Sequence, residues 1–114
     1  LKKKFHTKVI NCKTIREKNY LAMSTRNQLL SKSQFDNAGK IALNLKKFKN
    51  TLKNKVNLQK LILDKCKILK KKFKIKIEYL ELRNIFNLRL SKSIKNSKLF
   101  IAYKIGTVRL IDNF

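Results

Sequence analysis

The chain has 114 residues, and its 30 Lys and Arg residues against 6 Asp and Glu residues give a formal net charge of +24. This length fits one small domain or part of a larger one, and a hydrophobic content of 43% allows a modest core. No segment approaches the ~18 apolar residues of a membrane span, and the basic N-terminus lacks a secretory signal core. We therefore expect a cytoplasmic protein without a membrane partner.

The first predicted elements are a strand and a polar segment. Residues 8–15 are rich in β-branched side chains and predict a strand. Residues 16–27 are polar and irregular, with a turn expected at Asn19 and Tyr20. Two serines that follow, Ser31 and Ser33, are candidate caps for a helix.

Two helices are predicted next, because apolar residues recur at spacings of three and four. The first such stripe extends over residues 33–53 and the second over residues 56–72. Both stripes are typical of helix faces that pack into a core rather than of a ligand pocket.

The pattern changes to short apolar runs after residue 75, which predicts strands at 75–83, 98–104 and 107–112. Gly106 can adopt the positive φ of a tight turn between the last two. The sequence therefore predicts an α+β fold in which two long helices pack on a small, three-stranded, mainly antiparallel sheet.

The cysteines and the single histidine do not form a recognisable site. Cys12 and Cys66 lie far apart and have no CxxC companion, and His6 has no acidic residue within one turn. A structural zinc site needs about four closely spaced ligands, so we expect two free thiols and no metal ligands in this chain.

Two explanations of the positive charge remain open. Lys, Asn and Ile, whose codons are A/T-rich, supply 49 of the 114 residues, which indicates mutational bias. Clustered cations can also bind a nucleic-acid backbone, so a small basic RNA- or ribosome-associated module is the alternative function. Lysine outnumbers arginine 25 to 5 and is scattered along the chain, whereas base-reading proteins rely on arginine. We expect nonspecific adhesion to RNA and no specific nucleic-acid partner.

The segment with the clearest chemistry contains Ser24, Thr25 and Arg26, just ahead of the predicted helix. Hydroxyl groups and a guanidinium at a helix N-terminus can bind phosphate oxygens. Ser and Thr before a helix also serve as simple caps, and both interpretations fit the residues alone.

Three segments carry a family resemblance, in order along the chain. Residues 16–27, REKNYLAMSTRN, resemble the signature R-E-x-D-G-L-A-M-S-S-R-N of pantothenate synthetases, the counterpart of the KMSKS loop of class I aminoacyl-tRNA synthetases. Residues 79–85, YLELRNI, are similar to the family's D-Y-L-E-L-R-D, and residues 101–113, IAYKIGTVRLIDN, to its A-A-R-L-G-x-x-R-L-I-D-N. The matches cover essentially the whole chain.

The resemblance implies an AMP-forming pantoate–β-alanine ligase. In that family ATP, carrying Mg²⁺, adenylates pantoate and releases pyrophosphate, and the β-alanine amine then displaces AMP. By resemblance, Ile15 and Met23 line the adenine pocket, while Ser24, Thr25 and Arg26 bind the ATP phosphates and act in catalysis. The full-length enzyme is expected to be a homodimer.

The resemblance also implies an incomplete enzyme. Residues 1–15 correspond to the last strand of a nucleotide-binding domain, and residues 16–114 to the C-terminal lid domain. The family's Rossmann-like first domain, with its HxGH histidines and pantoate pocket, is absent, so this fragment alone should be inactive. Asn19 and Tyr20 replace the signature's Asp-Gly, which makes the backbone of the loop uncertain, since tyrosine adopts glycine-only angles at a cost. A folded, inactive remnant is a third alternative.

Overall fold

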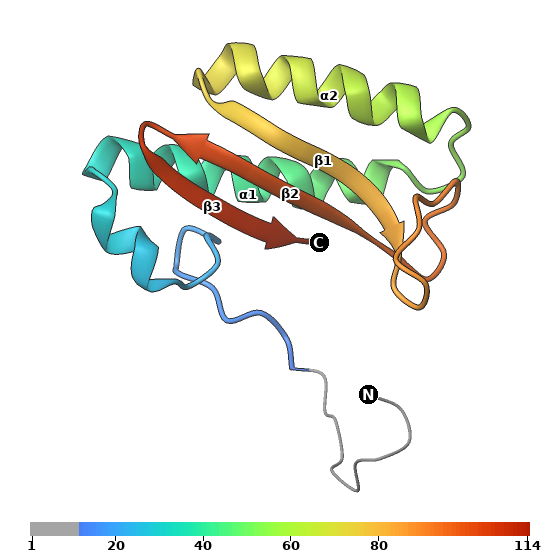
Figure 1. Ribbon diagram of the computed structural model, residues 1–114, viewed down its shortest axis with the longest axis horizontal. Helices are drawn as coiled ribbons and strands as arrows, with labels where there is room; N and C mark the ends of the chain where they lie inside the picture. The colour runs from blue at the N-terminus through green and yellow to red at the C-terminus, as the bar shows by residue number, and fades with distance from the viewer. Residues whose placement is uncertain (1–11) are drawn as a thin grey trace, which may run out of the picture.

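The computed structural model describes residues 12–114 and contains two helices, a short 3₁₀ helix and three strands (Figure 1). In chain order these are η1 (Thr25–Leu29), α1 (Lys32–Thr51), α2 (Leu58–Phe73), β1 (Lys76–Asn84), β2 (Ser97–Ile105) and β3 (Val108–Asn113).

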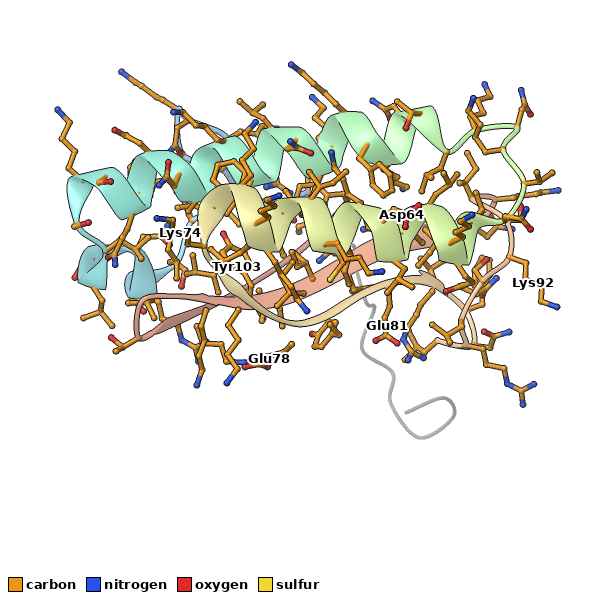
Figure 2. All side chains as sticks on the ribbon, turned by 90° about the horizontal axis from the view of Figure 1, so that it is seen from above. Asp64, Lys74, Glu78, Glu81, Lys92 and Tyr103 are labelled. Carbon is orange, nitrogen blue, oxygen red and sulfur yellow. The ribbon has the colours of Figure 1, made fainter. Side chains whose placement is uncertain are left out.

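The two helices form one layer and the sheet forms the other. The sheet order is β1-β2-β3, and both strand pairs are antiparallel. Helices α1 and α2 run in opposite directions and cover the same face of the sheet (Figures 1 and 2). The predicted α+β fold is confirmed, with each boundary within two residues of its expected position.

Helix α1 begins where the sequence offers a reciprocal cap. The Ser31 hydroxyl accepts a hydrogen bond from the Gln34 backbone N–H at 3.1 Å, and the Gln34 side chain accepts one from the Ser31 N–H at 3.0 Å. This capping box satisfies two donors that the first turn leaves free. Ser31 is thus the cap, and the other candidate, Ser33, lies inside the helix.

The core lies between the layers. Its most completely buried side chains come from both helices and from the inner faces of β1 and β2; they are Ile41, Leu45, Leu52, Leu69, Leu82, Leu99 and Ile101. Each such side chain stabilises the fold by about 1.5–3 kcal/mol relative to exposure. The helical stripes of the sequence are therefore core, as predicted.

The strand pairing sends alternate side chains to opposite faces. Leu99, Ile101 and Tyr103 of β2 are buried, whereas Lys98 and Lys104 are exposed. A β-bulge between Ile77 and Tyr79 shifts the register of β1. The β2–β3 turn is tight, and Gly106 adopts a φ of 60° there, as its sequence position predicted.

The predicted strand at residues 8–15 is wrong where it can be assessed. Residues 8–11 lie outside the described part of the chain, and residues 12–15 have no strand structure. Arg16 instead pairs with Ala22 as an isolated bridge. High β-propensity does not form a strand without a neighbouring strand to supply hydrogen bonds, and residues 12–15 have none among the described residues.

Candidate functional site

The polar segment folds into a small hairpin beside β3 (Figure 1). The Glu17 N–H donates to the Leu21 carbonyl at 2.7 Å, and the Met23 N–H donates to the Ile15 carbonyl at 2.9 Å. The predicted turn at Asn19 and Tyr20 closes this hairpin. Its second strand leads directly into the residues with the candidate chemistry.

Tyr20 occupies the left-handed region, with a φ of 80°. Such a conformation costs a non-glycine residue roughly 1–3 kcal/mol. The Tyr20 ring lies between two cations, with the Arg16 guanidinium 4.3 Å and the Lys46 ammonium 4.8 Å from its centroid. Each cation–π contact contributes about 0.5–1 kcal/mol, so together they offset much of the strain. The glycine-like backbone therefore persists with tyrosine in place.

Asn19 ties the turn to α1. Its side-chain amide donates to the Phe35 carbonyl at 3.0 Å, and its side-chain oxygen accepts from the Leu21 N–H at 3.1 Å. Gly39 makes room for this contact, since a Cβ there would lie 2.6 Å from Asn19 Cγ and 2.8 Å from its carbonyl oxygen. The glycine in the middle of α1 thus serves the hairpin rather than the helix.

Ser24 starts the short helix η1. Its hydroxyl oxygen accepts a hydrogen bond from the Arg26 N–H at 3.2 Å, so the capping interpretation of the sequence is confirmed. The long helix begins only at Lys32, and η1 has five residues. The expectation that a long helix dipole faces these residues is therefore wrong, because a 3₁₀ turn intervenes. Any attraction for anions must come from side chains.

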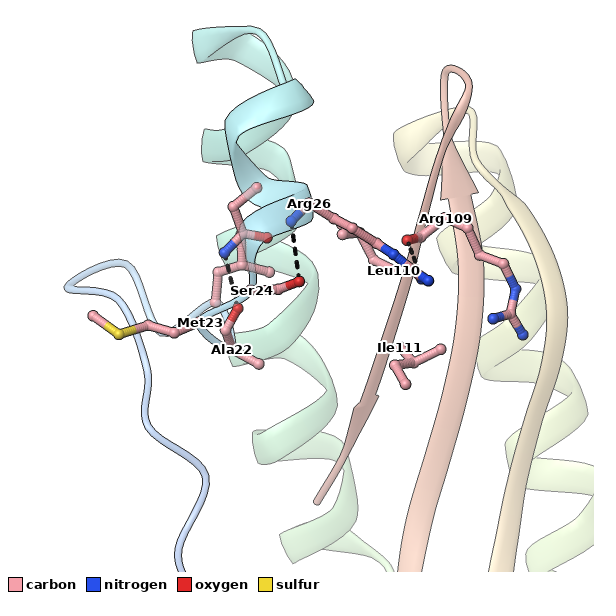
Figure 3. A pocket seen from close by; sticks show the side chains of 9 residues that line it. Ala22, Met23, Ser24, Arg26, Arg109, Leu110 and Ile111 are labelled. Carbon is pink, nitrogen blue, oxygen red and sulfur yellow. Dashed lines mark hydrogen bonds between the residues drawn. The ribbon is translucent and has the colours of Figure 1, made fainter.

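A cavity of about 360 Å³ lies between this loop and β3 (Figure 3). Its lining consists of Leu21, Ala22, Met23, Ser24, Arg26, Asn27, Arg109, Leu110 and Ile111. Two arginines and a serine hydroxyl face an otherwise apolar surface, and no carboxylate belongs to the lining. Such a cavity suits a small anion or one end of a larger ligand.

Arg26 reaches across the cavity to β3 (Figure 3). Its Nη1 donates to the Arg109 carbonyl at 3.3 Å, which leaves the other guanidinium donors available. Arg109 is neutralised differently, because its Nε donates to the Glu78 carboxylate at 2.9 Å on the outer face of the sheet. Among the described residues, Arg26 has no carboxylate within ion-pair distance.

The structure brings together three of the five predicted site residues. Met23, Ser24 and Arg26 line the cavity. Thr25 is exposed at the start of η1 without lining the cavity, and Ile15 is 71% exposed and reaches the site only through its backbone bond to Met23.

Sequence reasoning missed Arg109 and Asn27. Both belong to the segments that carry the resemblance, but nothing in their spacing indicated that β3 forms one wall of the cavity. Asn27 is 8% exposed, and its side-chain amide donates to the Ala22 carbonyl at 2.9 Å, which closes the loop on itself.

Metal ligands do not gather anywhere in residues 12–114, where no three His, Cys, Asp or Glu side chains lie close enough to hold an ion. Cys12 is exposed and Cys66 partly buried, and both are free thiols. Neither α1 nor α2 has the length and apolarity to cross a membrane.

Comparison with known proteins agrees with the three sequence segments. The sequence model of the family described as "Pantoate-beta-alanine ligase" matches residues 2–114. A pantothenate synthetase of Clostridium botulinum strain Langeland is 37% identical over 96% of this chain, and that of Ruthia magnifica is 41% identical over 87%. The chain spans 40% and 35% of the length of these two relatives.

Solved structures give the same result for the fold. Pantothenate synthetase from Thermus thermophilus superposes with a TM-score of 0.74 over 89% of this chain and 37% of its own, at 22% identity. A pantoate-β-alanine ligase from Francisella tularensis, complexed with β-γ ATP and β-alanine, has a TM-score of 0.59 and 29% identity over 95% of this chain and 33% of its own.

These matches and the arginine-lined cavity define a domain of an ATP-dependent ligase. The chain belongs to the pantoate–β-alanine ligase family.

Proposed function

We propose that this chain supplies the phosphate-binding lid of a ligase that condenses pantoate and β-alanine. In the first half-reaction a pantoate carboxylate oxygen attacks the α-phosphorus of ATP and pyrophosphate leaves. In the second, the β-alanine amine attacks the acyl carbon of pantoyl adenylate, AMP leaves, and the amine loses a proton.

The observation that carries this proposal is the unpaired guanidinium of Arg26 in a cavity without carboxylates. Negative charge moves onto the leaving pyrophosphate as the adenylate forms, and a guanidinium placed there stabilises the transition state more than the ground state. The Ser24 hydroxyl has a proton to donate, since its hydrogen bond to the Arg26 N–H uses the oxygen as acceptor.

The remaining predicted residues have supporting roles in this proposal. Met23 is 55% exposed at the cavity and Ile15 is its backbone partner, so both can cover an adenine ring brought by the rest of the enzyme. Thr25, exposed beside Ser24, can reach a phosphate once a nucleotide extends beyond the cavity.

The proposed division of the chain is residues 1–15 as the last strand of the nucleotide-binding domain and residues 16–114 as the lid. The HxGH histidines and the pantoate pocket then belong to the rest of a cytoplasmic, homodimeric enzyme. Mg²⁺ would arrive bound to the ATP phosphates and neutralise part of their charge, because the described residues offer no cluster of carboxylates to hold it.

Sequencing the gene upstream of the Leu1 codon tests this division directly. We expect a reading frame with an HxGH motif and a Rossmann pattern. The full-length product should then exchange labelled pyrophosphate into ATP only when pantoate is present. A full-length, folded product without pantoate-dependent exchange would refute the proposal in favour of an inactive remnant.

A further inference from the structure

Arg16 links two distant parts of the chain near the cavity. Its Nη1 donates to the Tyr20 carbonyl at 3.0 Å and to Asp112 Oδ2 at 2.8 Å. Its Nη2 donates to Asp112 Oδ1 at 3.0 Å and to the Asn113 carbonyl at 3.2 Å. One guanidinium therefore connects the hairpin turn to the end of β3, 96 residues away in sequence.

The pair that Arg16 forms with Asp112 differs from the other ion pairs in burial. The Arg16 and Asp112 side chains are 14% and 8% exposed, whereas those of the Arg83–Glu81 pair are 35% and 32% exposed. The Arg16 guanidinium is also covered by the rings of Tyr20 and Phe114, at 4.3 and 5.0 Å. Removing one member of a buried bidentate pair leaves an uncompensated charge, so the geometry of this pair is strongly held.

The position of the pair relates it to the cavity. β3 forms one wall, and the loop that follows the hairpin forms the other. The walls are joined at two places, by Arg16 to Asp112 and by the Arg26 guanidinium to the Arg109 carbonyl. The second link is a single bond of 3.3 Å between exposed groups, which a phosphate ligand would compete for. The Arg16–Asp112 pair is therefore the link that persists when Arg26 turns to a ligand.

We propose that Arg16 and Asp112 are positioning residues that hold the hairpin against β3 and so set where Ser24 and Arg26 meet a phosphate. This inference rests on the proposed function of the loop. Neither residue lines the cavity, so neither contacts the ligand, and their effect is exerted through the loop.

The test uses the ¹⁵N-labelled chain titrated with pyrophosphate and followed by NMR, residue by residue. In the parent chain the amides of Ser24, Thr25 and Arg26 should shift saturably. Asp112→Asn keeps the size of the side chain and removes its charge, so these amides should move before ligand is added and the affinity should fall about 10-fold or more. Amides of α2 and β1 should stay in place.

Two further variants complete the experiment. Glu81→Gln, the matched control, removes the charge from the exposed pair and should leave the titration unchanged. Arg16→Lys retains the charge but loses the fork, so its affinity should lie between those of the parent and Asp112→Asn.

The possible results separate the two proposals. Parent-like affinity in folded Asp112→Asn overturns the positioning role alone, while absence of a saturable shift in the parent chain refutes both. Global unfolding of both Asp112→Asn and Arg16→Lys would also overturn the inference, because the pair would then support the whole fold.

Discussion

The two ends of the molecule use their positive charge in different ways. At the end with the hairpin and β3, Arg16, Arg26 and Arg109 each donate to a defined acceptor. At the other end, a groove of about 470 Å³ between the α1–α2 turn and the β1–β2 loop is lined by Lys53, Lys55, Lys92 and Lys95 (Figure 1). None of these lysines forms an ion pair among the described residues.

The difference shows that placement, rather than amount, of charge identifies the site. A rigid guanidinium fork fixes direction at the hairpin end, whereas a flexible ammonium group that extends into water fixes nothing. The net charge of +24 is therefore a property of the whole surface, and the candidate site depends on only a few of its cations.

Replacing Arg26 should give the largest effect on activity. In the full-length ligase, Arg26→Ala should slow pantoate-dependent adenylation by ~100-fold or more, because the leaving pyrophosphate loses a positioned donor. The melting temperature should barely change, since the side chain is exposed and its removal leaves no cavity. Arg26→Lys should recover only part of the rate.

Lys55→Ala, at the opposite end, is the matched loss of one charge and should leave the rate unchanged. Pyrophosphate exchange at the parental rate in Arg26→Ala would assign the phosphates to another group and remove the contrast between the two ends.

Gly39 offers a stability test of the hairpin end. Alanine for glycine inside a helix normally stabilises by up to ~1 kcal/mol. Here the added Cβ would meet Asn19 Cγ at 2.6 Å, so Gly39→Ala should instead lower the free energy of unfolding by about 1–3 kcal/mol. Denaturant melts measure the change, and Lys40→Ala, at the next and exposed position, should be nearly neutral. A stabilised Gly39→Ala would mean that the hairpin does not pack tightly on α1.

The lysine-rich groove should bind RNA weakly and without sequence preference. Replacing Lys53, Lys55, Lys92 and Lys95 together by glutamine should weaken adhesion at low salt and flatten its salt dependence by at most ~0.7 per contacted phosphate. Adenylation in the full-length ligase should be unaffected. Replacing four lysines elsewhere, such as Lys60, Lys67, Lys70 and Lys76, should have a similar effect. Tight, salt-resistant binding to one RNA that only the first set abolishes would instead establish a specific site.

The smallest effects concern pH. Burial, followed by repulsion from Lys98, lowers the pKa of Lys49, and burial with repulsion from Lys72 lowers the pKa of Lys65. The unfolded chain then binds more protons than the folded one, so stability should rise with pH up to the ordinary lysine value of 10.5. The pKa of Tyr103 is raised by burial and by Asp112, so stability should fall once pH exceeds the ordinary tyrosine value of 10.0.

Thermal melts at low salt should therefore show a shallow maximum near pH 10, since the lysine gain ends where the tyrosine loss begins. Lys49→Met should reduce the alkaline rise. A melting temperature that falls steadily from pH 7 to pH 10 would contradict the burial of these lysines.

The sequence predicted the elements with a strong period and failed where partners decide the structure. The stripes of α1 and α2 and the apolar strands were readable because burial imposes periods of 3.6 and 2. The strand at 8–15 was wrong over its described residues because propensity says nothing of a missing neighbour. Ser24 and Arg26 were found through the resemblance, whereas Asp112 required the long-range contact that only the fold reveals.

The tyrosine at the hairpin turn has a consequence for the history of this chain. The family signature has glycine at this position, and Tyr20 keeps the positive φ that glycine would adopt freely. With Arg16 and Lys46 now lying on its ring, a return to glycine would relieve the strain but remove both cation–π contacts and loosen the backbone. A substitution that began as a cost has become one on which its neighbours depend. Tyr20 is in this sense entrenched, and reversal would require compensating changes at Arg16 and Lys46.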